Sequence, residues 1–75
     1  MIGCSDDSKW AVISTGNKVI IKDNEHKRET FSRIFSVTMS GAVFVGDICV
    51  LIAKGIYKGL FFLRYITGKW KYIKE

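Results

Sequence analysis

Proline is absent from the 75-residue sequence, and histidine and cysteine are scarce, with one His and two Cys. Without an X–Pro bond the chain has no ordinary cis peptide switch. One His and two distant Cys cannot supply the three or four clustered ligands of a zinc site. Cys4 and Cys49 lack a CxxC spacing and form no disulfide framework. We expect a buried thiol at Cys49 and a free thiol at Cys4, with a single bridge between them as the alternative. Reduced thiols suit a cytoplasmic location.

The groups that catalysis uses are also scarce. His26 lies in a charged run that predicts an exposed turn, and no serine has a candidate base apart from it. Gly55 and Gly59 lack the spacing of a phosphate-binding loop. We therefore predict that the protein is not an enzyme and uses no cofactor or metal.

The composition indicates one small domain made of strands. Hydrophobic residues make up 48% of the chain, too many for a disordered segment. Val, Ile and Thr together number 20, against 8 for Ala, Leu, Met and Gln. Branching at Cβ suits a pleated sheet better than a helix. We expect residues 1–8 to be a flexible N-terminal tail and residues 9–75 a single small β domain.

Apolar segments separated by Gly, Asn and Asp predict the strands. Residues 24–39 have two interpretations. As a helix, they would be capped by Asp23 or Asn24 and would place Phe31 and Phe35 on one face; their Thr, Val and Ser content favours a strand over 30–39. Residues 42–53 are too apolar for an alternating strand, so we expect them to be buried on both faces. The expected strands are 9–14, 18–22, 30–39, 42–45, 48–53, 60–66 and 69–73.

The predicted fold is all-β, either a small SH3-like or OB-like barrel or a strongly curved antiparallel sheet. An α+β fold with one short helix near 24–39 is the alternative. Six or seven short strands with turns marked by glycine are typical of such small barrels.

Charge is distributed unevenly along the chain, whose formal net charge is +5. Between Lys54 and Lys74 there are six basic and no acidic residues, with aromatic residues between them. Basic residues neutralise phosphates, and aromatic rings stack on unpaired bases. Our first hypothesis is therefore nucleic-acid binding, with phosphate contacts from Lys54, Lys58, Arg64, Lys69 and Lys71 and stacking by Tyr57, Tyr65 and Trp70. The alternative is that Trp70 and Tyr72 are core residues and the lysines are solvated.

A protein-binding module is the second hypothesis, for instance an inhibitor or adaptor encoded by a phage or mobile element. Adjacent residues on a strand point to opposite faces, so either Phe61 or Phe62 lies on the outer face. The anchors of this interface would be Phe61, Phe62, Tyr65 and Trp70. Self-association to a homo-oligomer is its simplest form.

Membrane association is the third hypothesis. Residues 34–53 carry one charge, Asp47, although a span of about 20 apolar residues is interrupted there. The segment from Met1 to Asp7 resembles the start of a mature bacterial lipoprotein, which implies an acylated Cys4. Basic residues would then lie near anionic lipid.

Overall fold

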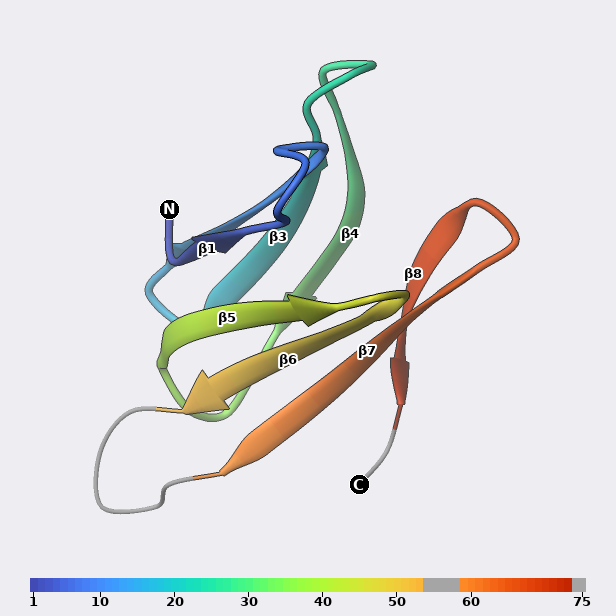
Figure 1. The fold of residues 1–75 in the computed structure, drawn as a ribbon. Coiled ribbons are helices and arrows are strands. Elements are labelled where there is room, and N and C mark those ends of the chain that lie inside the picture. The colour runs from blue at the N-terminus through green and yellow to red at the C-terminus, as the bar shows by residue number, and fades with distance from the viewer. Residues whose placement is uncertain (54–58, 74–75) are drawn as a thin grey trace.

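The computed structural model describes residues 1–53 and 59–73 of the chain. In these residues the fold is all-β, as predicted, and consists of two four-stranded antiparallel sheets in the orders β1-β2-β3-β4 and β5-β6-β7-β8 (Figure 1). We call them sheet β1–β4 and sheet β5–β8. The narrower expectation of an SH3-like or OB-like barrel gains no support from these two meanders. The strands are β1 (Gly3–Cys4), β2 (Trp10–Thr15), β3 (Lys18–Asp23), β4 (Arg28–Ile34), β5 (Met39–Val45), β6 (Ile48–Ala53), β7 (Leu60–Ile66) and β8 (Lys69–Ile73).

Glycines make the tight hairpins between neighbouring strands possible. Gly16 follows β2 with a φ of 61°, and Gly46 follows β5 with a φ of 59°. In both turns the glycine occupies the first of the two positions between the paired strands, where a type II′ turn requires a positive φ. The short turns set the register, and with it the face to which each side chain points.

The segment 24–39 contains strand β4, so the strand interpretation is confirmed and the helix is wrong. The strand is shorter than expected, because β4 ends at Ile34 and β5 begins at Met39. Phe35 and Met39 lie at the two ends of the connection and are both buried. Their burial holds the connection against the core where the chain passes from one sheet to the other. A single strand over 30–39 could not make this passage.

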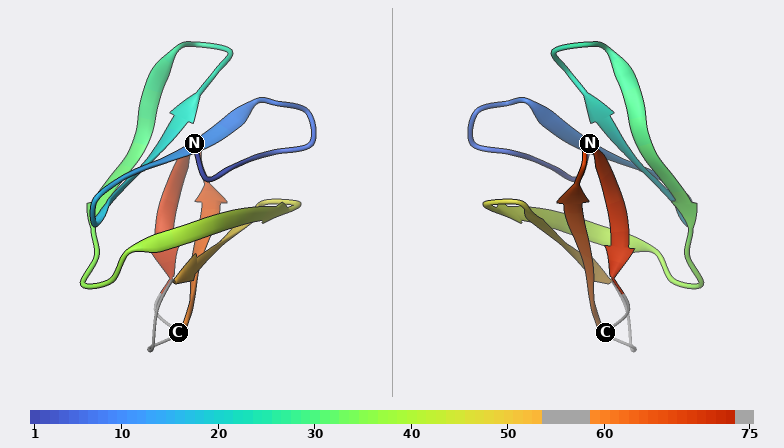
Figure 2. Two further views of the ribbon diagram at one scale, coloured as in Figure 1. Left: turned by 90° about the vertical axis from the view of Figure 1, so that its left-hand side faces the viewer. Right: turned by 90° about the vertical axis from the view of Figure 1, so that its right-hand side faces the viewer.

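The core lies between the two sheets, which face each other and are joined by the connection from β4 to β5 (Figure 2). Sheet β1–β4 contributes Val12, Val19 and Ile21, and sheet β5–β8 contributes Cys49, Leu51 and Leu63, all without exposed surface. Both cysteines are free thiols, and Cys49 is the buried one, as predicted. Burial raises the pKa of the Cys49 thiol to about 12.

The first strand joins the two sheets at one margin. From its polar composition we expected the segment 1–8 to be a flexible tail. In the structure it contains a short strand, because Gly3 and Cys4 pair with β2. On the other side of β1, the Ala42 N–H of β5 donates a hydrogen bond of 3.2 Å to the carbonyl oxygen of Ile2. A Cβ at Gly3 would overlap the carbonyl oxygen of Ala42 and lie 2.9 Å from its Cβ. Only glycine allows the two backbones to come this close.

The opposite margin, between β4 and β8, is held by a stacked side chain. The Arg33 guanidinium of β4 lies 4.4 Å from the ring centroid of Tyr72 on β8 and 5.6 Å from that of Phe35. A guanidinium over an aromatic ring is favourable by about 0.5–1 kcal/mol at an exposed site. The two sheets together therefore approach a barrel, with backbone contact at one margin and side-chain contact at the other.

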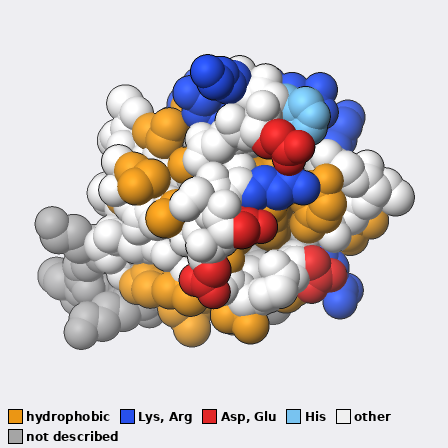
Figure 3. Space-filling view, turned by 45° about the horizontal axis from the view of Figure 1, so that its top comes forward, with side chains coloured by type: hydrophobic (Ala, Val, Ile, Leu, Met, Phe, Trp, Pro, Cys, Tyr) orange, Lys and Arg blue, Asp and Glu red, His pale blue; other side chains and the backbone are white. Residues whose placement is uncertain are grey.

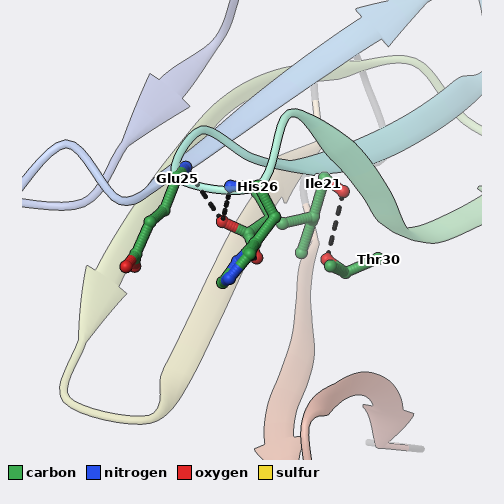
Figure 4. A network of polar contacts seen from close by, with 5 residues as sticks. Ile21, Glu25, His26 and Thr30 are labelled. Atoms are coloured by element: carbon green, nitrogen blue, oxygen red, sulfur yellow. Dashed lines mark hydrogen bonds and ion pairs between the residues drawn. The ribbon is translucent and has the colours of Figure 1, made fainter.

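The β3–β4 turn is organised around a buried carboxylate, Asp23, which is 3% exposed. The backbone N–H groups of Glu25 and His26 donate to its Oδ1 at 3.0 and 3.2 Å, and His26 Nδ1 lies 2.9 Å from its Oδ2 (Figure 4). Burial raises the pKa of Asp23, but the hydrogen bonds from His26 and Glu25 outweigh it, so the pKa lies below its ordinary value. The ionised carboxylate is therefore part of the turn.

We expect Gly3→Ala to destabilise the fold by about 1–3 kcal/mol, because the added methyl overlaps Ala42. Chemical denaturation measures the change. Gly41→Ala is the matched control: it is also a strand glycine, but its Cβ would meet only Ile52 Cδ1 at an ordinary 3.7 Å. Equal stabilities of the two variants would contradict the close approach of β1 to β5.

Acid should weaken the fold through Asp23. Since its pKa is lower in the folded state, its contribution is complete above the ordinary value of 3.8 and is lost as the pH falls through the folded value. We expect Asp23→Asn to lower the denaturation midpoint at pH 7. The midpoints at pH 7 and pH 2 should then differ less than they do in the unsubstituted protein. Glu25→Gln removes the same charge from an exposed position of the same turn. An equal effect of both substitutions would contradict the role of Asp23.

Candidate interaction face

Sheet β5–β8 is apolar on both sides. Side chains alternate along each strand, so those next to the buried Cys49, Leu51 and Leu63 point away from sheet β1–β4. On β6 and β7 these neighbours are mostly Ile, Val, Leu and Phe. We call the outward apolar side chains the apolar face; they are Val43, Val45, Ile48, Val50, Ile52, Leu60, Phe62, Ile66 and Ile73.

The register places these side chains in rows across the sheet. The central row runs over all four strands and is wholly apolar: Val43, Val50, Phe62 and Ile73. The row on one side begins with Val45 and Ile48 and ends with Arg64 and Lys71. The row on the other side holds Gly41, Ile52 and Leu60.

This surface is unevenly accessible, since Val50, Phe62 and Ile73 of the central row are half-buried and the most exposed residues lie on β5 and at the start of β7. The exposed fractions of Val45, Val43 and Leu60 are 64%, 48% and 48%. From the spacing of strands and residues, four strands and three rows span about 400 Å², of which the eight apolar positions occupy about 270 Å². Apolar patches of a few hundred Å² occur on small proteins and are often functional. The expectation that residues 42–53 are buried on both faces is therefore wrong, because sheet β1–β4 covers only one side of them.

The outward face of sheet β1–β4 has a different composition. On β3, Lys18 and Lys22 flank Ile20, and Ser32 of β4 pairs with Ile20. Figure 3 shows one side of the molecule on which acidic and basic side chains are interspersed with hydrophobic ones. Ile13 and Ile34 also lie on this outward side, but Lys18 and Lys22 lie among them, and such a mixture is ordinary for a solvated sheet.

Three of the predicted phosphate-binding residues lie at one corner of the outward side of sheet β5–β8, beside the apolar face. Arg64 pairs with Lys71 across β7 and β8, and Lys69 pairs with Ile66 next to them. Arg64 Nε lies 3.9 Å from Asp47 Oδ2, and both side chains are more than half exposed. An exposed pair at this distance contributes little stability, but it reduces the net charge beside the apolar rows. Lys54, Tyr57 and Lys58 lie outside the described residues.

The predicted stacking residues are on the other side of the sheet. Trp70 is 3% exposed, and its ring lies 5.7 Å from that of Trp10 and 5.5 Å from those of Phe44 and Tyr65. Trp70 is thus a core residue, and stacking of its ring on bases is ruled out in this fold. Tyr65 is half-buried and also points inward. The register separates both rings from the basic corner, because cations and aromatics alternate along β7 and β8.

Of the four aromatic anchors predicted for protein binding, Phe62 alone points outward. Phe61 packs inside, 5.5 Å from Phe35 and 6.4 Å from Tyr72. The aliphatic residues of β5 and β6 make up most of the apolar face, and none of them was among the predicted anchors. The sequence does indicate these residues, because both the odd and the even positions of 42–53 are mostly apolar. We attributed this pattern to burial on both faces.

One cluster of ligand-type side chains has a structural explanation. Ligand atoms of Asp23, Glu25 and His26 lie within 4.8 Å of one another. Both oxygens of Asp23 already accept hydrogen bonds within the turn, and Glu25 and His26 are exposed. The cluster stabilises the hairpin and gives no indication of a metal centre.

Comparison with known proteins gives no match to a family model, to a curated protein or to a solved structure. Within the described part of the chain, no helix has the length and apolar character that a membrane crossing requires.

Proposed function

We propose that this chain is a non-catalytic protein-binding module that docks through the apolar face of sheet β5–β8. The observation that carries the proposal is the apolar row across all four strands, in a sheet whose other side already forms the core. Covering about 270 Å² of apolar surface is favourable by about 7 kcal/mol before the cost of association is subtracted. An exposed apolar surface lowers the solubility of a protein unless a partner covers it.

The residue types favour a protein as the partner. Branched aliphatic side chains in register on a pleated surface pack well against a second sheet or an apolar helix. The basic residues of sheet β5–β8, Arg64, Lys69 and Lys71, lie at one corner, where they form part of a polar rim. An apolar centre with a charged margin is the usual anatomy of a protein interface.

Photo-crosslinking in the cells that produce the protein tests this function. With p-benzoyl-phenylalanine in place of Val43, in the central row, we expect adducts with protein. The matched control carries the same group in place of Ser32, an exposed residue on the outward side of sheet β1–β4, and should give few adducts. Equal labelling from both positions, or adducts only with lipid or nucleic acid from position 43, would refute the proposal.

Nucleic-acid binding is the second candidate, and the basic corner is the observation that favours it. Arg64, Lys69 and Lys71 lie together, with Phe62 on the same side of β7. Three neutralised phosphates predict a log–log salt dependence with a slope of about −2 for a single strand. The Tyr65 and Trp70 rings do not take part, so the contribution of stacking is small.

Fluorescence anisotropy of labelled single-stranded DNA and RNA at several salt concentrations measures this activity. For a nucleic-acid-binding protein we expect Lys69→Gln with Lys71→Gln to flatten the slope by about one to two units. The control is Lys18→Gln with Lys22→Gln, which removes the same charge from the other sheet. No binding at low salt, or an equal effect of both pairs, would exclude the basic corner as the binding site.

A further inference from the structure

We infer that a groove between the two sheets binds a doubly charged oxyanion, namely a phosphate group that is free or is carried as a monoester on a larger ligand. The groove has a volume of about 350 Å³ and lies between the start of β4 and the turn from β7 to β8. Its lining residues are Arg28, Glu29, Thr30, Gly68 and Lys69. The inference goes beyond the proposed function, because this groove is at the margin between the sheets and not on the apolar face.

Each of the two sheets contributes one cation to the groove. Arg28 is the first residue of β4 in sheet β1–β4, and Lys69 is the first residue of β8 in sheet β5–β8. Both residues are exposed, and neither forms an ion pair with a described carboxylate. A guanidinium and an ammonium group on two walls of one groove attract an anion and supply the hydrogen-bond donors that its oxygens accept.

The carboxylate that pairs with Arg28 in the strand register is already used by the β3–β4 turn. This carboxylate is Asp23, which lies opposite Arg28 on β3. Its Oδ1 accepts hydrogen bonds from the backbone N–H groups of Glu25 and His26, and its Oδ2 lies 2.9 Å from His26 Nδ1. The turn therefore satisfies Asp23, and the Arg28 guanidinium remains available to a ligand in the groove.

Glu29 is the acidic member of the lining, and a lysine outside the groove offsets its charge. It pairs with Lys22 in the register of β3 and β4, and oppositely charged side chains at paired positions attract each other. The hydroxyl group of Thr30 already donates to a backbone carbonyl oxygen at 3.2 Å. Arg28 and Lys69 are therefore the side chains that give the groove a net positive charge and donors for an anion.

The two cations and the size of the groove favour a phosphate group over a carboxylate. A phosphate monoester carries a charge of about −1.5 to −2 at pH 7 and has three strongly accepting oxygens, so it can accept from both cations at once. A carboxylate carries a single charge on two oxygens. The volume of about 350 Å³ falls within the range of small-molecule sites, about 300–1,000 Å³, so a group attached to the phosphate also has room.

A bound phosphate also links the two sheets. Elsewhere along the same margin, the Arg33 guanidinium of β4 stacks on the ring of Tyr72 of β8. A phosphate that accepts from both Arg28 and Lys69 adds a second link between β4 and β8. Since a ligand that binds the folded state alone stabilises it, phosphate binding raises the melting temperature of the protein.

Titration of the purified full chain with inorganic phosphate, followed by NMR of the backbone amides, tests the site. The phosphate concentration rises to about 20 mM while sodium chloride keeps the ionic strength constant. We expect saturable shifts of the Thr30, Gly68 and Lys69 amides. The dissociation constant should lie in the millimolar range, because water and salt screen the two exposed cations.

Arg28→Gln combined with Lys69→Gln should weaken phosphate binding about tenfold or more and reduce the rise in melting temperature. The matched control is Arg64→Gln combined with Lys18→Gln, which also removes one exposed arginine and one exposed lysine, one from each sheet. Phosphate stabilises folded proteins generally because it is excluded from their surface, so the difference between the two double variants is the measure of the site. Circular dichroism verifies that both are folded.

Two capped tripeptides distinguish the sources of the phosphate. Acetyl-Gly-phosphoserine-Gly-amide that binds at least tenfold more tightly than inorganic phosphate supports the site and assigns it to a phosphorylated protein segment. Equal affinities support the site and assign it to the free anion. Equal binding of acetyl-Gly-Ser-Gly-amide and its phosphorylated form would overturn the inference, because the phosphate would then contribute nothing.

Three results of the titration would likewise overturn the site: shifts that rise without saturation, shifts that sodium chloride alone reproduces, and an equal loss of binding in the two double variants. None of these results bears on the proposed function, since crosslinking from Val43 tests the apolar face and uses no residue of the groove.

Discussion

The structure depends on one geometric constraint, that a β-sheet has two faces and that side chains alternate between them. In this chain the first four strands form the only described layer that packs against sheet β5–β8. They cover the side that carries Cys49, Leu51 and Leu63. No described strand packs against the side that carries Val43, Val50 and Phe62, although its side chains are just as apolar. The candidate site is therefore the second face of a sheet whose first face forms the core.

The same constraint separates the two chemistries that the C-terminal half of the chain contains. Along β8, Lys69 and Lys71 alternate with Trp70 and Tyr72, so the cations point outward and the rings point inward. In the linear sequence this alternation looks like a surface for single-stranded nucleic acid. In the sheet, Trp70 instead packs against Trp10 and Phe44, and Tyr72 packs against Phe35 and Phe61. The cations then lie beside aliphatic side chains, which favours protein docking over base stacking.

The margins of the two sheets explain how so short a chain encloses a core. At one margin, Gly3 brings the backbone of β1 against Ala42 of β5. At the other, Arg33 reaches across from β4 and stacks on Tyr72 of β8. A domain of this size buries only about 60% of its unfolded surface, so contacts that exclude water at both margins matter to its stability.

Local patterns in the sequence determined the strands and their turns. Branched residues between Gly, Asn and Asp placed most strands within a few residues, because pleating and positive φ are local requirements. The burial of Cys49 followed from the apolar run around it. The sequence also contained the signal of the apolar face, as Val and Ile at both alternating positions of 42–53, but composition cannot show how many layers will cover a sheet.

Only the tertiary structure decided which of those positions are exposed, because exposure depends on where the other sheet packs. It likewise decided that β1 belongs to the fold, since Gly3 has no pattern of its own and is required only by the approach of Ala42. Trp70 became a core residue, Phe61 packs against the core and Phe62 points outward, through a register set by distant turns. A single-residue change in that register would have reversed all three assignments.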